Sequence, residues 1–492
     1  MKEQSEPTRL LRWIDTRLGL SHPLLRPVPR YAINPLYWLG ALTVVAFVIQ
    51  GVTGMIMMLY YIPNPMEAFP STQYIFQSVF YGRFLESVHL YTAYAMIMLA
   101  FMHMMRGYFV SVHKKPREIM WFVGMVMGFV TLGFGFTGYL LPWTVVSKSA
   151  TDVGVGMIDA LPAPLSSLLS FLIIGAGGDA TQLLRFYDLH VVILPAVLLV
   201  LLTVKMYMLE THGISEPVTA LGETKPRRTI PIFPDVSLYL LELAAIFGAI
   251  MLLISVVFPL NLPPQYTPEL ASQFIPQPDW YFLWIYQLLK ISVFEGAGLP
   301  VAMSVVTIIF LLLFLLPVID RGETRKIRNR PLFVALGLIF VGEVFVLAYW
   351  GLITPGQVIP TEVAATVLGG SALLIALISL GLSKLINSQI KGHLPTNKAS
   401  TQAITVVWAG PMLVGLLALG SVSISAFFGN SAQLVIGGVN FEALASLCLS
   451  ATLLGAVFLG TFIFLYRLEL RIGSVKRRIP LFEFGGVQNG SE

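Results

Sequence analysis

Apolar residues run in long stretches along this chain, and polar residues gather in the segments between them. A helix needs about 20 apolar residues to cross the hydrocarbon core of a bilayer. Stretches of that order predict ten membrane-spanning helices, at 37–61, 86–110, 119–140, 183–209, 235–259, 299–319, 331–354, 362–385, 403–428 and 440–466. The apolar stretch 153–174 is broken by the prolines of ALPAPLSS and predicts a re-entrant or interfacial helix on the outer side. The pattern therefore predicts an all-α polytopic membrane protein.

Composition supports this class, because 56% of the residues are hydrophobic and only 12% are charged, against about 25% charged in ordinary soluble domains. Lys and Arg gather before the first predicted span and after every second one. Since cytoplasmic loops are rich in Lys and Arg, this distribution predicts a cytoplasmic-membrane protein with both termini in the cytoplasm. It also accounts for the net charge of +5, which therefore gives no support to nucleic-acid binding.

The remaining compositional signals narrow the chemistry. The polar, basic stretch of about 35 residues before the first span argues against a cleavable signal peptide. The only cysteine, Cys448, excludes a disulfide framework and a cysteine cluster for iron–sulfur or zinc. Neither a phosphate-binding loop nor a dinucleotide-binding glycine pattern stands out in a suitable context.

Three of the seven histidines lie in predicted spans: His89 and His103 in the second, and His190 in the fourth. The first two are fourteen residues apart, which returns a helical side chain to within about 40° of the same face, about 21 Å along the axis. Imidazoles so placed suit two stacked planar cofactors, rather than one metal ion whose ligands converge within about 2.0–2.6 Å. The alternative is that both histidines only form hydrogen bonds to neighbouring helices.

Pairs of glycines share this fourteen-residue spacing on the first and third spans. Glycine in a membrane helix lets another backbone or group approach closely. Because successive spans run in opposite directions, the predicted topology arranges the glycines and their facing side chains in two levels. The inner level comprises Gly40, Gly124, His103 and the Lys205 region, and the outer level comprises Gly54, Gly138, His89 and His190. Each level suits a flat macrocycle between four helices.

Several motifs occur in an order typical of one family. They are TGYLLPW at 137–143, KKPRE at 114–118, RFYDLH at 185–190, HGISEP at 212–217 and PDWY at 278–281. Together with the histidine spacing, they resemble cytochrome b of quinol-oxidising bc-type complexes. The resemblance covers residues 30–350 and is closest to the plastid and cyanobacterial branch, in which cytochrome b is divided into two subunits.

This resemblance implies an N-terminal four-helix di-haem bundle followed by about six further transmembrane helices. The implied parts are a cytoplasmic N-terminal segment (1–36), the di-haem bundle (37–217), a part that completes the quinol pocket (218–354), additional transmembrane helices (355–470) and a cytoplasmic tail (471–492). The spans after about 355 carry no motif, and either partner binding or simple packing explains them.

The resemblance also implies that His89 and His190 hold an outer haem and that His103 holds an inner one. The family's remaining ligand is a histidine fourteen or fifteen residues after His190, and position fifteen is Lys205. A lysine in a membrane helix costs about 2.5–3.5 kcal/mol on insertion scales. We therefore expect Lys205 to bind the inner haem iron as a neutral amine. The alternative is that it extends to the interface and leaves that haem five-coordinate or absent.

The haems implied are b-type or an a- or o-type derivative, and two arginines are assigned to their propionates. Arg106 would serve the inner haem and Arg185 the outer one, although either arginine also suits a helix end at the interface. One departure from the plastid-like pattern is Glu86, which stands three residues before His89 in place of an arginine. Arg83, one turn further out, is the substitute that the sequence offers.

Quinol oxidation is assigned to the outer side. There the resemblance places Asp279 where the family usually has the glutamate that binds quinol and accepts its proton, a role that suits a general base. Pro278, Trp280 and Tyr281 complete that motif, and Tyr139 belongs to the facing wall with residues 142–155. An interfacial aromatic belt explains the aromatic residues equally well, but it does not explain the carboxylate.

The implied mechanism divides the two electrons of quinol. One passes to a Rieske iron–sulfur protein, and the other crosses the two haems to a quinone near the cytoplasm, where Glu210 and His212 are candidate proton donors. The implied partners are quinol, the lipid bilayer, a downstream carrier or terminal oxidase, and a second copy or a supercomplex. Two other classes stay open: a di-haem anchor of a quinone-linked dehydrogenase or reductase, and a transporter that uses Lys205 and Glu343 as intramembrane charges.

Overall fold

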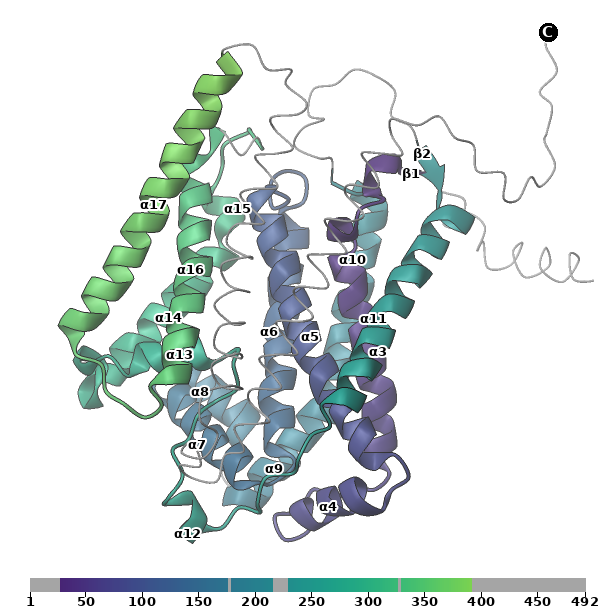
Figure 1. The fold of residues 1–492 in the computed structure, drawn as a ribbon, viewed down its shortest axis with the longest axis vertical. Coiled ribbons are helices and arrows are strands. Elements are labelled where there is room, and N and C mark those ends of the chain that lie inside the picture. Colours follow the sequence, from purple (N-terminus) through teal and green to yellow (C-terminus); the bar gives the residue numbers. More distant parts are fainter. Residues whose placement is uncertain (1–26, 176–177, 216–228, 326–328, 392–492) are drawn as a thin grey trace, which may run out of the picture.

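The computed structural model describes residues 27–175, 178–215, 229–325 and 329–391, and these form an assembly of helices (Figure 1). Strands are limited in this part of the chain to β1 (Pro27–Pro29) and β2 (Thr229–Pro231), which pair antiparallel with Val28 opposite Ile230. The predicted fold class, an all-α polytopic membrane protein, is therefore confirmed.

The first four long helices form a bundle. They are α3 (Leu39–Met58), α5 (Gly82–Phe109), α6 (Glu118–Leu140) and a continuous helix made of α9 (Gly178–Asp188), the π-helical turn η4 (Leu189–Ile193) and α10 (Leu194–His212). Helix α5 packs against both α3 and α6, and α6 packs against α10. The bundle core includes Leu42, Ala46, Tyr91 and Ala95, where small side chains let α3 and α5 approach.

Short elements close the ends of this bundle. The two 3₁₀ turns η1 (Arg30–Ala32) and η2 (Pro35–Tyr37) precede α3, and α4 (Ala68–Ser78) lies across the lower end in Figure 1. After α6 follow α7 (Val145–Asp159), α8 (Leu165–Leu169) and η3 (Ser170–Ile174). The stretch predicted at 153–174 is thus two separate helical pieces, because Pro162 and Pro164 interrupt the backbone between them.

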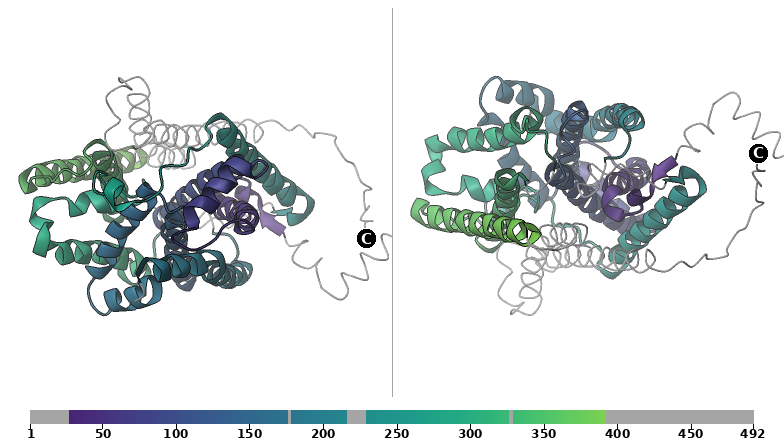
Figure 2. Two further views of the ribbon diagram at one scale, coloured as in Figure 1. Left: turned by 90° about the horizontal axis from the view of Figure 1, so that it is seen from below. Right: turned by 90° about the horizontal axis from the view of Figure 1, so that it is seen from above.

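The C-terminal part flanks the bundle. It consists of α11 (Ser237–Val257), α12 (Pro268–Ala271), α13 (Leu283–Leu289), η7 (Ser292–Phe294), η8 (Gly296–Gly298), α14 (Leu299–Phe314), α15 (Leu316–Ile319), α16 (Pro331–Ile353) and α17 (Thr361–Lys391), with η6 (Ile232–Val236) leading into α11. Helix α11 packs on α5, whereas α16 packs on α13 and α17. Both views in Figure 2 show α17 at the edge of the molecule, away from α11.

Seven predicted spans coincide with helices long and apolar enough to cross a membrane among the described residues: those at 37–61, 86–110, 119–140, 183–209, 235–259, 331–354 and 362–385. The span predicted at 299–319 is different, because α14 ends at Phe314 and α15 is separate. Pro317 has no N–H for the carbonyl of Leu313, and the Trp121 indole donates to that carbonyl instead at 3.0 Å. The predicted spans 403–428 and 440–466 lie outside the described residues.

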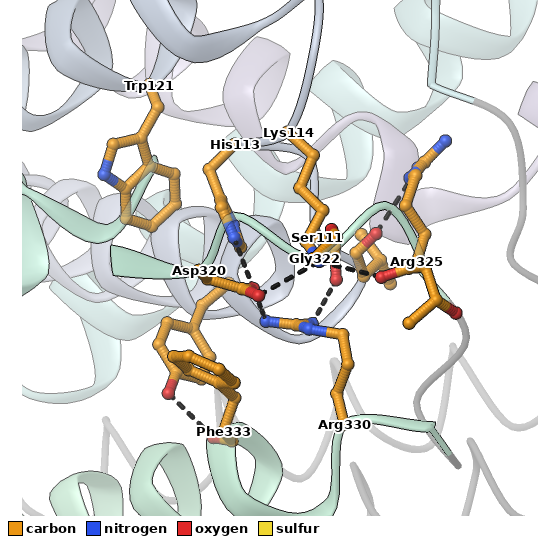
Figure 3. Close-up of polar contacts among 12 residues, drawn as sticks. Ser111, His113, Lys114, Trp121, Asp320, Gly322, Arg325, Arg330 and Phe333 are labelled. Carbon is orange, nitrogen blue, oxygen red and sulfur yellow. Dashed lines mark hydrogen bonds and ion pairs between the residues drawn. The ribbon is translucent and has the colours of Figure 1, made fainter. Parts of the chain in front are cut away.

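Asp320 follows α15, at the end of the molecule opposite α4 in Figure 1, and ties the bundle to the C-terminal part through the contacts drawn in Figure 3. Its Oδ2 accepts a hydrogen bond from His113 Nε2 at 2.9 Å and another from Arg330, and its Oδ1 lies 3.0 Å from Lys114 Nζ. Lys114 also donates to the carbonyls of Gly322 and Thr324. We call Asp320, His113, Lys114 and Arg330 the Asp320 cluster. It joins the α5–α6 connection to the α15–α16 connection.

The ionisation of this cluster depends on burial. Burial lowers the pKa of His113 to about 4, so its imidazole is neutral at pH 7 and donates its Nε2–H. Burial alone would raise the pKa of Asp320, but the hydrogen bonds from His113 and Lys114 and the nearby charges outweigh it, so that pKa lies below its ordinary value. Because the pKa values of His113 and Asp320 in the folded protein both lie below their ordinary values, the unfolded chain binds more protons at acidic pH than the folded protein does. Stability is therefore complete at neutral pH, falls through His113 between about pH 6.5 and 4, and falls further through Asp320 below that.

Replacing Asp320 by asparagine is expected to destabilise the fold by about 3–5 kcal/mol, because two buried cations lose their only counter-charge in the cluster. The apparent melting temperature of the purified protein in detergent measures this loss. Glu323→Gln is the matched control, since Glu323 is exposed in the same connection. Equal melting temperatures for the two variants would show that the cluster does not stabilise the fold.

Candidate functional site

Two imidazoles face each other inside the bundle. His89 lies on α5 and His190 in the π-helical turn η4, and their ring centroids are 6.3 Å apart with the planes inclined at 61°. If each imidazole nitrogen binds one iron at about 2 Å from opposite sides, the ring centres are about 6 Å apart. The spacing therefore fits a metal with one imidazole on each face.

The hydrogen bonds of both rings leave the facing nitrogens free to bind. The Thr53 hydroxyl donates its proton to the carbonyl of Ile49 and lies 2.8 Å from His89 Nδ1. Because its proton is already used, the hydroxyl oxygen accepts a hydrogen bond from the N–H at His89 Nδ1. His190 Nδ1 lies 3.1 Å from the carbonyl of Phe134, which can only accept. Both imidazoles therefore carry their proton on Nδ1 and present an unprotonated Nε2, the arrangement that orients metal-binding histidines.

Four glycines on α3 and α6 each lie against one of the four candidate ligands. A Cβ atom at Gly54 would stand 3.3 Å from His89, and one at Gly138 would stand 2.5 Å from His190. In the other layer, a Cβ at Gly40 would stand 3.1 Å from His103 and one at Gly124 would stand 3.0 Å from Lys205 Nζ. The structure thus brings together the members of each predicted level.

The turn η4 explains why Lys205, fifteen residues after His190, can face a glycine that is fourteen residues from the glycine facing His190. Pro195 has no N–H to bond the carbonyl four residues before it, and the helix widens there into a π-helical turn. Such a turn takes up one extra residue. Lys205 therefore occupies the angular position that a fourteen-residue spacing has in a regular helix.

The second layer differs from the first in its hydrogen bonds. His103 Nδ1 is buried and has no hydrogen-bond partner in the described part of the chain. Lys205 is half-buried, and none of the hydrogen bonds or ion pairs among the described residues involves its Nζ. An imidazole with a buried, unpartnered Nδ1 and an amine with no partner in the described part of the chain, both facing glycines, would suit the ligands of a planar metal cofactor.

The basic residues assigned to propionates have other contacts. The Arg106 guanidinium is buried and lies 4.1 Å from the centre of the Tyr37 ring. Arg185 donates to the carbonyl of Phe171 at 2.5 Å, and Arg83 donates to the carbonyl of Leu260 at 2.6 Å.

Glu210 and His212, the candidate proton donors near the second layer, are both exposed at the end of α10. The His212 Nδ1 lies 3.0 Å from the carbonyl of Met208 within the same helix. Its backbone carbonyl accepts a hydrogen bond from Arg117 at 2.9 Å. The structure thus places these side chains at the surface of the molecule.

A second polar site lies where the segment before α13 meets α5 and α6. Asp279 Oδ1 accepts a hydrogen bond from Tyr94 at 2.8 Å, and its Oδ2 accepts one from Tyr281 at 3.3 Å. Gly135 on α6 leaves room for the Tyr281 ring, since a Cβ there would stand 2.8 Å from the hydroxyl. Tyr139, one turn further along α6, is close enough to interact electrostatically with Asp279.

Aromatic rings enclose this carboxylate. Trp280 makes edge contacts with Tyr94 and with Tyr281, at 6.3 and 5.6 Å between centroids. Pro278 directly precedes Asp279, and the segment reaches α13 only at Leu283. Burial raises the pKa of Asp279 to about 6, against the opposing effect of the hydrogen bonds from Tyr94 and Tyr281. The group is therefore a base of moderate strength near neutral pH.

Three site residues were missed in the sequence. Tyr94 has no motif, and its role depends on a contact across 185 positions. Thr53 and Thr137 had a signal, because each directly precedes an outer-level glycine in the same Thr-Gly pair. Thr137 lies 3.2 Å from His190 Nδ1, as Thr53 does at 2.8 Å from His89. Leu39 and Val123 precede the inner-level glycines, so the inner level has no hydroxyl at the positions that Thr53 and Thr137 occupy in the outer level.

The fold and these contacts define a polytopic helical membrane protein whose first four long helices carry two pairs of candidate ligands, each facing glycines. Two family models match consecutive parts of the chain: "Cytochrome b(N-terminal)/b6/petB" at residues 94–268 and "Cytochrome b(C-terminal)/b6/petD" at residues 264–369. Together they cover more than half of the chain. The chain belongs to the cytochrome b family of bc-type complexes, and it is accordingly an oxidoreductase subunit.

Individual relatives agree with this assignment. A "Cytochrome bc complex cytochrome b subunit" of Chlorobaculum thiosulfatiphilum is 31% identical over 345 residues, which are 68% of this chain and 79% of the relative. "Cytochrome b6" of Heliobacterium mobile is 41% identical over 39% of this chain and 90% of the relative. "Cytochrome b" of Sulfolobus acidocaldarius is 27% identical over 85% of this chain and 78% of the relative.

A solved structure shares the fold. A chain of a "Hyperthermophilic respiratory Complex III" superimposes with a TM-score of 0.59 and 24% identity, covering 76% of this chain and 96% of that chain. The predicted resemblance to cytochrome b is therefore confirmed by family, by relatives and by fold.

Proposed function

We propose that this chain is the di-haem subunit of a quinol-oxidising complex in the cytoplasmic membrane. The observation that carries the proposal is the two-layer arrangement, in which four glycines on α3 and α6 each abut one candidate ligand. The fourteen-residue spacing sets the layers about 21 Å apart along a helix. Family membership supplies the expectation of haem, and the separation of the imidazole rings supports it independently.

In this proposal His89 and His190 hold one haem, and His103 and Lys205 hold the other. When bound, each haem supplies a one-electron carrier. Thr53 and the carbonyl of Phe134 hold the first pair of imidazoles in the tautomer that can bind iron. The glycines make room for the ring faces and edges. Arg106 and Arg185 are assigned to propionates of the inner and outer haems, each by turning from its present partner.

Quinol reacts at Asp279. A quinol hydroxyl donates its proton to the Asp279 carboxylate, which acts as general base. Trp280, Tyr281 and Pro278 form one side of the pocket, and Tyr139 forms the other. The distribution of Lys and Arg puts this end on the outer side of the membrane, so the proton is released there.

The electrons leave in two directions. We assign one to a Rieske-type iron–sulfur partner at the outer side, in line with the name of the Chlorobaculum relative as part of a bc complex. The other is assigned to a quinone at the cytoplasmic end, where the exposed Glu210 and His212 are available to donate protons. A downstream carrier or terminal oxidase completes the chain of partners, within a dimer or supercomplex.

The haem content of the purified protein tests this proposal. We expect two haems per chain, both reduced when quinol is added to the complex. A colourless protein, or one haem per chain, would contradict it. Reduction by dithionite but not by quinol would instead reject the quinol part of the proposal.

Replacing Asp279 by asparagine is expected to lower the rate of quinol oxidation by about 10²-fold or more, since a general base contributes about 10²–10⁴. In the native protein the rate should fall below about pH 6, because Asp279 is ionised only above the pKa to which burial raises it. Steady-state rates across pH 5–9 measure both effects. Glu269→Gln serves as the control, since Glu269 is an exposed carboxylate in the same connection. A similar loss in both variants would argue against Asp279 as the base.

A further inference from the structure

Tyr94 joins α5 to the candidate base through a hydrogen bond that no motif in the chain predicts. Its hydroxyl lies 2.8 Å from Asp279 Oδ1, near the ideal length for an O–H···O bond, whereas Tyr281 lies 3.3 Å from Oδ2, beyond that range. Tyr94 therefore makes the stronger of the two hydrogen bonds to this carboxylate. It comes from a helix 185 positions away in the sequence.

The geometry of α5 lets one helix serve two sites. Tyr94 follows His89 by five residues, so its side chain is rotated by about 140° from His89 and displaced by about 7.5 Å along the axis. His89 accordingly points into the bundle towards His190, and Tyr94 points outwards to the segment before α13. The Tyr94 ring is held there by edge contact with Trp280 and by a tilted contact with Tyr281.

The contacts also decide which oxygen of Asp279 is available to substrate. Oδ1 is engaged by Tyr94, and the weaker bond of Oδ2 to Tyr281 is the easier one to exchange for a bond from a quinol hydroxyl. The aspartate side chain has few rotatable bonds, so one strong hydrogen bond is enough to fix the plane of the carboxylate. The groups that face Asp279 are Tyr94 from α5, Tyr139 from α6 and Tyr281 from its own segment.

We propose that Tyr94 is the positioning residue of the quinol site, which orients Asp279 and sets the pH range in which its carboxylate accepts a proton. This inference rests on the proposed role of Asp279 as the base. A phenol that donates to a carboxylate stabilises the ionised form, and the Tyr94 hydrogen bond indeed lowers the pKa of Asp279 against the effect of burial. Without the Tyr94 hydrogen bond, Asp279 is ionised only from a higher pH upwards and accepts a proton over a narrower pH range.

The test is Tyr94→Phe, which removes only the hydroxyl. A hydrogen bond to an ionised group is expected to shift the acid limb of the pH–rate profile upwards by about one pH unit from its midpoint near 6. Quinol oxidation would then fall about fivefold at pH 6 and by only about a tenth at pH 8, since the ionised fraction is what changes. Tyr91→Phe is the matched control, because Tyr91 lies on the same helix and donates at 2.7 Å to the carbonyl of Phe258.

Infrared titration of the oxidised complex without quinol gives a readout that does not depend on turnover. The carboxylic-acid band that Asp279→Asn removes should titrate at higher pH in Tyr94→Phe than in the native protein or in Tyr91→Phe. An unshifted band, or a loss of rate equal at every pH, would overturn the role of Tyr94. If the native complex fails to oxidise quinol while the band still shifts, the proposed function fails and the Tyr94–Asp279 coupling stands.

Discussion

Gly138→Ala is expected to abolish binding of the haem held by His89 and His190 and to leave the other haem in place. The added methyl would stand 2.5 Å from the His190 ring, a separation that real Cβ atoms essentially never show. In our proposal this imidazole would bind the haem iron, and it is held by Phe134 and Thr137 on the same helix as Gly138. It therefore cannot retreat without losing its orientation towards His89.

The haem-to-protein ratio, with redox-difference spectra, measures this outcome. The ratio should fall from two to one, with loss of one of the two spectral components. Gly128→Ala is the matched control, because Gly128 lies on the same helix and a Cβ there has nothing within 4 Å. That variant should keep both haems and gain up to about 1 kcal/mol of helix stability. Two haems with native spectra in Gly138→Ala would reject the outer-level site.

Lys205→Ala is expected to lose the inner haem or to hold it through His103 alone. The amine faces Gly124 in the position that His190 has towards Gly138 one layer away. Iron binds the amine only as the free base. A histidine at 205 offers a neutral nitrogen, so Lys205→His should restore a six-coordinate haem with altered spectrum and potential.

Lys205→Arg separates coordination from a merely interfacial lysine. Arginine keeps the positive charge and the long apolar stem of lysine, so its side chain can also extend to the interface. It cannot be deprotonated in proteins and so does not bind iron. Paramagnetic resonance spectra of the oxidised variants report the coordination of each haem. An inner-haem signal unchanged in both Lys205→Arg and Lys205→Ala would show that Lys205 is not a ligand.

The turn η4 shows that residue spacing identified Lys205 but did not predict the direction of its side chain. Counting fifteen residues from His190 leads to Lys205, yet in a regular helix that count turns the side chain by about 60° rather than −40°. The widened turn next to Pro195 removes this discrepancy. A proline inside a helix predicts some irregularity, but whether it becomes a kink or a π-helical turn depends on what the neighbouring helix offers.

The stretch predicted as one span at 299–319 is divided into two helices for a similar reason. Hydropathy reads α14 and α15 as one apolar stretch, while the backbone is interrupted at Leu315 and the carbonyl of Leu313 turns to Trp121. The partner that satisfies this carbonyl is 192 positions away. No local pattern contains that information.

The amino-acid sequence by itself determined the membrane class, the four-helix bundle, the two glycine levels and the family, because hydropathy, helical period and motif order are properties of neighbouring positions. Only the tertiary structure decided that Thr53 accepts from His89, that Tyr94 engages Asp279 and that Asp320 gathers His113, Lys114 and Arg330. Each of these contacts joins side chains from separate helices or connections. Their formation depends on how apolar helices pack against one another, and packing depends on the whole chain at once.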